Sequence, residues 1–309
     1  GRVPEAALLE SVPLYSSSTS VGDWLSMDGT VETSRTIAGK MKSWKYEELV
    51  TACSHWVETA AQSEDTRLYT LALITRLRDQ SYDTGRKRRA SVLSLLDAAL
   101  QDILNAVPLL TDGKTGRINR IDWSSREQLQ PPTDPKGILV VDISGFPPEG
   151  DENAGIFLAL AVEKGWHHLI TFNWRGQRFA GCGLSANSKG VRMDVYGSSG
   201  DYLGSGLDGA EIYVHDSAQD QVGQIFNAGR IVIHGDTGQT FMYGAKGGEV
   251  YVLGNAAGRP LINAVGKPRV VINGTALDFL AESFMAGDPL NGGGFVIVNG
   301  LWVDDHGNV

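Results

Sequence analysis

A short phrase recurs at a fixed interval between residues 191 and 300, and this repeat constrains the fold more than any other feature. Four copies, each 19 residues after the one before, begin at Val191, Ala210, Gly229 and Gly248. Two further copies lack the first residue of the phrase and begin at Arg269, 20 residues after the equivalent Glu249, and at Phe295, 26 residues later. A fixed period of this size indicates stacked structural repeats in a solenoid.

Each copy alternates in the manner of a β-strand, whose successive side chains point to opposite faces. The two inward columns contain only apolar residues, namely Met193, Ile212, Ile231, Val250, Val270 and Val296, and Val195, Val214, Ile233, Val252, Ile272 and Val298. A weaker second track contains Leu203, Val222 and Phe241, and beside them Leu207, Phe226, Ala245 and Ala264. We therefore expect two strands per repeat in a parallel β-helix, with about 4.8 Å between coils.

Glycines follow the repeated strands and predict the corners of the coils. They stand at Gly197, Gly235, Gly254, Gly274 and Gly300. Glycine turns at such a position with little steric cost because it has no Cβ.

The outward-facing side chains change character along the repeats. One column alternates in sign through Arg192, Glu211, Arg230 and Glu249. Exposed pairs contribute only about 0 to 1 kcal/mol each, so we interpret this column as a determinant of register. The neighbouring column begins at Asp194, with Tyr213 and Val232 next, and becomes apolar toward the C-terminus.

The apolar end of that outward face is a candidate partner interface. Its residues are Tyr251, Val271, Phe295 and Ile297. We expect them to be covered, either by the N-terminal part of the chain or by another protein. The segment Phe279–Leu290, inserted in the long last repeat, is expected at the edge of this contact.

Two stretches carry a resemblance to a known family. Tyr243–Gly258 resembles the GXGXG domain at the C-terminus of the glutamate synthase large subunit, and Gly176–Leu184 is similar to the opening segment of that domain in stand-alone versions. The similarity covers residues 137–300, and the chain also resembles, more distantly, one of the subunits of formylmethanofuran dehydrogenase. The resemblance implies a right-handed β-helix with a structural role.

The resemblance also implies where the chemistry of such a complex is carried out. This sequence contains neither an N-terminal cysteine for glutamine hydrolysis nor a flavin-binding barrel, and its two cysteines form no iron–sulfur series. Flavin and iron–sulfur clusters are therefore expected on partner subunits, with no catalytic, cofactor-binding or metal residues assigned to this chain.

Composition restricts the partners and the compartment. A formal charge of −9 argues against nucleic acid or an anionic membrane as the main partner. Two cysteines, Cys53 and Cys182, are too few for a disulfide framework, which favours a reducing cytoplasm. No apolar run approaches the roughly 20 residues of a membrane helix.

The pattern before the repeats changes from irregular to helical and then to mixed. We predict an irregular arm over 1–40, a helical domain over 41–110, a linker over 111–136, a β-α-β cap over 137–190 and the β-helix over 191–309. Within the helical domain the periodicity predicts helices over 43–61, 63–80 and 88–107, the second with an N-cap at Ser63.

Several side chains that often perform chemistry have structural interpretations here. Cys182 has no histidine or carboxylate neighbour in sequence, and we interpret it as a buried small residue at a coil corner. Cys53 and His55 point to different faces of a predicted helix and do not form a joint metal site. His215 and His234 lie one coil apart, close enough to share a proton or a metal. We favour a stacked ladder or a partner contact, because Leu253 occupies the next position.

Two further motifs have a functional and a structural interpretation. Gly204–Gly206 and Gly292–Gly294 suggest phosphate loops, but neither precedes a helix in a βαβ unit, and coil corners explain them better. The basic run Arg86–Arg89 indicates either a contact with an acidic partner or a solvated helix start.

We therefore predict a mainly β protein with a helical domain, acting as a non-catalytic scaffold subunit of a glutamate-synthase-like oxidoreductase complex. Its partners would be the other subunits, or a second copy of itself. The alternatives are an enzyme with a groove site between helical domain and β-helix, and a free-standing protein-binding module.

Overall fold

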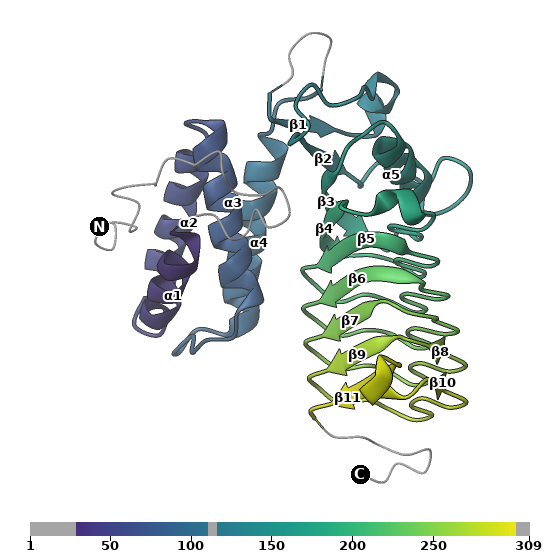
Figure 1. The fold of residues 1–309 in the computed structure, drawn as a ribbon. Helices are drawn as coiled ribbons and strands as arrows, with labels where there is room; N and C mark the ends of the chain where they lie inside the picture. The colour runs from purple at the N-terminus through teal and green to yellow at the C-terminus, as the bar shows by residue number, and fades with distance from the viewer. Residues whose placement is uncertain (1–28, 111–115, 301–309) are drawn as a thin grey trace. The chain divides into compact units, whose positions relative to one another are not determined.

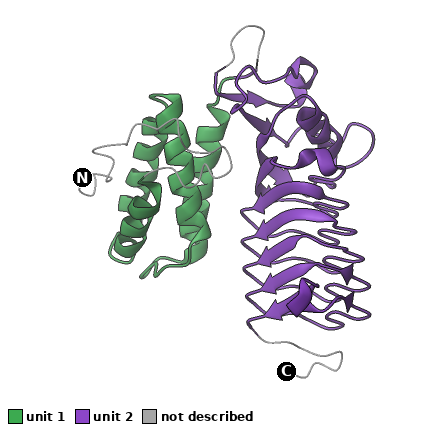
Figure 2. Cartoon of the chain, viewed as in Figure 1, with its two compact units in different colours: residues 1–108 green, residues 109–309 purple. Residues whose placement is uncertain are grey.

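The computed structural model describes residues 29–110 and 116–300. The chain divides into two compact units, residues 1–108 and residues 109–309, shown in green and purple in Figure 2. Residues 1–28 of the predicted arm, 111–115 of the predicted linker and 301–309 of the predicted β-helix lie outside the described residues.

The first unit is helical. Its helices are α1 (Thr30–Met41), α2 (Tyr46–Ala60), α3 (Glu64–Asp79) and α4 (Arg89–Asn105). The three predicted helices are present, and the Ser63 hydroxyl caps α3 by accepting a hydrogen bond from the Thr66 N–H at 3.1 Å. Trp56 and Leu49 are fully buried in the core. None of the described helices combines the length and apolar character that a membrane span requires.

Helix α1 corrects the prediction of an irregular arm that extends to residue 40. Its buried positions are Thr30, Ser34, Ile37 and Met41, which recur at helical spacing on one face. Because two of the four are small polar residues, apolar periodicity alone does not reveal the helix.

The second unit is built on a parallel sheet of nine strands, in the order β1-β2-β3-β4-β5-β6-β7-β9-β11. The strands are β1 (Ile118–Ile121), β2 (Ile138–Asp142), β3 (His168–Arg175), β4 (Arg192–Ser198), β5 (Asp208–Val214), β6 (Ala228–Ile233), β7 (Glu249–Val252), β9 (Arg269–Ile272) and β11 (Phe295–Val298). Helix α5 (Ala154–Glu163) connects β2 to β3, and 3-10 turns occupy Trp123–Gln128, Ala186–Ser188 and Pro289–Asn291. Figure 1 shows β5, β6, β7, β9 and β11 stacked in sequence order.

The start of the sheet contains one strand that the sequence did not predict. Strand β1 lies in the predicted linker and pairs with β2. Its sequence, Ile-Asn-Arg-Ile, contains two apolar residues and is too short to be recognised as a strand. The predicted β-α-β unit is present, and because β3 pairs with β4 it extends the sheet of the repeats.

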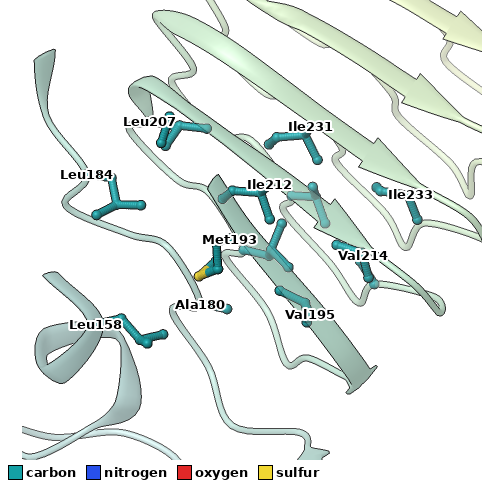
Figure 3. Packing of buried hydrophobic residues seen from close by; sticks show 14 of the residues in the cluster. Leu158, Ala180, Leu184, Met193, Val195, Leu207, Ile212, Val214, Ile231 and Ile233 are labelled. Atoms are coloured by element: carbon teal, nitrogen blue, oxygen red, sulfur yellow. The ribbon is translucent and has the colours of Figure 1, made fainter. Parts of the chain in front are cut away.

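The register of the repeats is the predicted one. Ile212 is the partner of Ile231, Ile231 that of Val250, and all three side chains are fully buried. In the second inward column, Val214 and Ile233 are paired and buried in the same way (Figure 3). The last strand contributes one residue to each column, and these residues, Val296 and Val298, are only partly buried. These columns join the second-track residues in one continuous hydrophobic core.

The second track corrects the prediction of a second strand in every repeat. Within the described residues, the strands on this side are only β8 (Val265–Gly266) and β10 (Met285–Ala286), which pair with each other. Instead, three alternate residues in each repeat have a positive φ. They form three columns, and the members of each column are one repeat apart. These columns are Tyr202, Gln221, Thr240, Arg259 and Phe279, then Gly204, Gly223, Met242, Leu261 and Ala281, then Gly206, Ile225, Gly244, Asn263 and Ser283.

Hydrogen bonds explain this backbone. The N–H groups of the first and third columns donate to the following repeat, as from Tyr202 to the Asp220 carbonyl at 3.0 Å. Those of the second column donate to the preceding repeat, as from Gly204 to the Ala180 carbonyl at 2.8 Å. The alternating backbone therefore connects each repeat to both neighbours. Gly204 and Gly206 supply positive φ at low steric cost, which explains the glycine doublet.

The predicted corner glycines are required for a different reason at most positions. Gly197 has φ +104°, but Gly235, Gly254, Gly274 and Gly300 do not have a positive φ. At those four a Cβ would collide with the corner of the preceding repeat. At Gly254, for example, it would meet the Asp236 carboxylate and the Gly235 carbonyl. Close stacking of corners, more than backbone conformation, excludes larger residues there.

Candidate functional site

A buried carboxylate on the outward side of the sheet is the centre of the main polar cluster of the second unit. Asp194 is fully buried in β4 and binds the guanidinium of Arg192, also in β4. His168, at the start of β3, places its Nε2 3.2 Å from Asp194 Oδ2. His215, directly after β5, places its Nε2 3.0 Å from Asp194 Oδ1. Three consecutive strands thus contribute to one cluster.

The charge state follows from these contacts. Burial acts to raise the pKa of Asp194, but Arg192 and the hydrogen bonds from His168 and His215 outweigh it and hold this pKa well below its usual range. Burial lowers the pKa of His168 despite the neighbouring Asp194. Because an ionised carboxylate only accepts hydrogen bonds, both imidazoles donate through Nε2–H.

The cluster has no acceptor left for a ligand. Asp194 accepts two hydrogen bonds from Arg192 and one from each histidine, and a carboxylate has about four acceptor positions. A metal ion would have to displace Arg192 or a histidine. The arrangement is therefore suited to fixing the three strands against one another, rather than to binding a cation at Asp194.

Stacked rings extend from this cluster along the sheet. Tyr196 lies 4.4 Å from the His215 ring and His215 lies 5.3 Å from the His234 ring, all nearly parallel. This confirms the predicted ladder at His215 and His234. The Arg192 guanidinium lies 4.0 Å above the ring of Tyr213, so it is held both by charge and by an aromatic face.

The alternating charges pair in the later repeats. Arg230 lies 3.0 Å from Glu249 and 3.7 Å from Glu211, with about two-fifths of its side chain exposed. Arg192 occupies the same column but is buried and binds Asp194. The column therefore forms partly exposed ion pairs between repeats at one end and is part of a buried cluster at the other.

Both cysteines are protonated; Cys53 is buried, whereas Cys182, for which the sequence predicts burial, is only partly buried. The Cys182 thiol donates to the Tyr202 carbonyl at 2.8 Å, and burial raises its pKa to about 11. It lines an open groove of about 580 Å³ beside α5. Burial raises the pKa of Cys53 in α2 to about 12. Neither thiol is activated as a nucleophile.

The predicted partner interface lies on the outward side of β7, β9 and β11. Tyr251 and Ile297 are 38% and 47% exposed, and Val271 and Phe295 are half-buried. Leu253 beside them is 39% exposed. In the inserted segment, Phe279 and Leu290 are 37% and 94% exposed.

Sequence reasoning did not identify the Asp194 cluster as a site. His168 stands 24 residues before Arg192, outside the 19-residue period, and only the pairing of β3 with β4 places it beside this column. One signal in the sequence could have indicated the cluster. Asp194 is a charged residue in a column whose later members, Tyr251, Val271 and Ile297, are largely apolar.

Comparison with known proteins finds similarity to one family over the repeat-containing part of the chain. Residues 161–302 match the family model of the GXGXG motif. A 124-residue stretch is 34% identical to ferredoxin-dependent glutamate synthase 2 of Synechocystis sp., covering 38% of this chain and 7% of that protein. No solved structure matches the chain significantly.

The predicted resemblance is thereby confirmed for this part of the chain. Residues 161–302 are similar to the GXGXG motif family, and the relative that the chain matches is a glutamate synthase. Within this stretch, Gly204 and Gly206 lie in the positive-φ columns of the second track.

Proposed function

We propose that this protein is a cytoplasmic scaffold subunit of a multi-subunit oxidoreductase related to glutamate synthase. Its GXGXG domain would hold partner subunits in position, and the flavin and iron–sulfur centres would belong to those partners. The observation that carries the proposal is an apolar strip on the outward face of a domain of this type.

The strip consists of Tyr251, Leu253, Val271, Phe295 and Ile297 on and beside β7, β9 and β11. The outward side chains of the earlier strands β4 to β6 include the charged and polar groups Arg192, Asp194 and Glu211. Three members of the strip are more than a third exposed, and contiguous exposed apolar side chains are typical of interaction sites. Burying such a strip against a second protein would provide a hydrophobic interface core.

The scaffold would be a right-handed parallel β-helix. Three observations support this form of the sheet: strands one repeat apart pair in parallel register, their inward columns are buried, and the second track is hydrogen-bonded from repeat to repeat. Such a solenoid gives a rigid, elongated support, because each repeat is fixed by its two neighbours.

Purification from the natural host tests the role. A tagged chain expressed at its native level should be isolated with partner polypeptides in fixed stoichiometry, and the complex should show flavin absorbance that the chain alone does not contribute. Recovery of the chain alone, or only as a homo-oligomer, would overturn the scaffold role.

A further inference from the structure

The helical unit contains a basic groove between two loops. The loop from α1 to α2 and the loop from α3 to α4 line an open groove of about 810 Å³. Four cations line it, namely Lys42, Lys45, Arg86 and Lys87. Tyr46, at the start of α2, adds an aromatic ring that is 45% exposed.

The two loops are fixed to each other. The Lys87 ammonium donates to the carbonyls of Met41 and Trp44, at 2.7 and 2.6 Å. Lys42 forms an ion pair of 2.8 Å with Asp83 across the groove. Gly85 has φ +64° and approaches the Lys42 carbonyl so closely that a Cβ would collide with it. The groove is therefore formed before any ligand arrives.

Two of its cations are not neutralised. Lys42 is paired with Asp83, and Lys87 is occupied by backbone carbonyls. The charged groups of Lys45 and Arg86 are exposed and form no ion pair among residues 29–110 and 116–300; the Glu48 carboxylate accepts a hydrogen bond from the Lys45 backbone N–H, at 2.6 Å, and not from its ammonium. The chain has 36 acidic residues and a formal charge of −9, so two unpaired cations from different loops of one groove form a local positive region in an acidic protein.

We propose that this groove is a docking site for an acidic peptide segment of a partner protein. Lys45 and Arg86, from different loops, would bind two carboxylates of the segment, and the exposed Tyr46 ring would contact the apolar part of a side chain between them. Charge complementarity of this kind steers association and selects the partner. Long-range repulsion from a chain of net charge −9 disfavours nucleic acid, which carries a much longer run of negative charge.

The test uses the full chain and a fluorescein-labelled hexaglutamate peptide, with binding followed by fluorescence anisotropy. We expect saturable binding that weakens as salt is raised, because exposed charges are screened. Lys45→Glu and Arg86→Glu should each weaken binding by about tenfold. Arg35→Glu, which reverses an exposed charge of α1 outside the groove, should leave the affinity nearly unchanged.

Three results would overturn the proposal. One is an absence of peptide binding at low salt. Another is an equal loss of affinity in all three variants, which would indicate general charge attraction. The third is tighter binding of a short duplex DNA or of inorganic phosphate than of the peptide. No partner subunit is present in this assay, so its outcome is separate from that of the proposed scaffold role.

Discussion

The guanidinium of Arg192 binds the carboxylate of Asp194, two residues further along strand β4, through two hydrogen bonds of 2.9 Å each. Bidentate pairs of this geometry are among the stronger charged contacts in proteins. Because both residues are buried, the removal of one partner leaves an uncompensated charge in the interior.

Arg192→Met should therefore destabilise the chain strongly. We expect a loss of about 3 to 5 kcal/mol in the free energy of unfolding, measured by urea denaturation. Arg230→Met is the matched control, because Arg230 stands in the same column but is about two-fifths exposed. It should cost no more than about 1 kcal/mol.

The double variant Arg192→Met, Asp194→Leu separates charge from packing. If the cost of the single change comes from the unpaired carboxylate, the double variant should recover much of the lost stability. Equal losses in Arg192→Met and Arg230→Met would instead show that burial of the pair has no energetic consequence.

Stability should also depend on pH through His168. Burial lowers the pKa of His168 in the folded chain below its ordinary value of 6.5. The unfolded chain then binds a proton that the folded chain does not, so stability is constant above pH 6.5 and falls below it. The slope is at most about 1.4 kcal/mol per pH unit for one group. Urea unfolding between pH 8 and pH 5 measures it.

His168→Gln is the informative variant, because its amide can still donate to Asp194 but does not titrate. Its stability should fall less between pH 7 and pH 5 than that of the unmodified chain. His167→Gln changes the exposed neighbouring residue and should keep the original profile. Identical profiles for His168→Gln and the unmodified chain would refute this assignment.

The inward columns give a sharp contrast between adjacent positions. Ile231→Asp would place a carboxylate in a fully buried apolar column, and we expect a cost of at least about 3 kcal/mol. Val232→Asp, one residue further and facing outward, should cost less than about 1 kcal/mol. Thermal unfolding of both variants checks the assignment of faces, which a similar cost at both positions would contradict.

The positive-φ columns predict a stabilising substitution. Ile225 has φ +56°, a conformation that a β-branched residue rarely adopts, and its side chain is 46% exposed. Ile225→Asn should stabilise the chain by about 0.5 to 1 kcal/mol, because asparagine tolerates left-handed backbone and already occupies this column at position 263.

Gly206→Ala is the converse test in the same column. A Cβ at Gly206 meets nothing within 4 Å, so the cost of about 1 kcal/mol would come from backbone conformation alone. Differential scanning calorimetry compares the two variants. Unchanged melting temperatures in both would mean that the left-handed positions are not strained.

The apolar strip predicts a separation of folding from assembly. Ile297→Lys should release the partner from the native complex while leaving the melting temperature of the isolated chain nearly unchanged, because an exposed side chain can reach solvent. Size-exclusion chromatography of the complex measures release. Ile156→Lys, a 51% exposed isoleucine on α5, is the matched control and should retain the complex. An intact complex with Ile297→Lys would place the partner elsewhere.

Sequence reasoning was most reliable where the structure repeats. The spacing of 19 residues and the alternation within each copy correctly predicted the neighbour and the face of Ile212, Ile231 and Val250. In a parallel sheet with constant repeat length, equivalent residues are stacked at one strand spacing, so sequence separation translates directly into register. The histidine ladder could be predicted for the same reason.

Sequence reasoning was wrong where a different pattern determined the structure. Helix α1 buries Thr30 and Ser34, and a search for apolar residues does not detect that face. The second track contains apolar residues at strand-like positions, yet its backbone is held by hydrogen bonds to both neighbouring repeats and includes left-handed residues such as Met242 and Leu261.

The sequence by itself thus determined the repeat, its register and the apolar columns, because alternation and period are local properties of the chain. Only the tertiary structure decided the Asp194 cluster and the basic groove. His168 joins Asp194 through the pairing of β3 with β4, and Lys87 joins Met41 through the packing of helices far apart in sequence. A buried charge is stable only where other groups pair with it and donate hydrogen bonds to it. Here those groups come from separate segments of the chain, and no local sequence pattern specifies their contact.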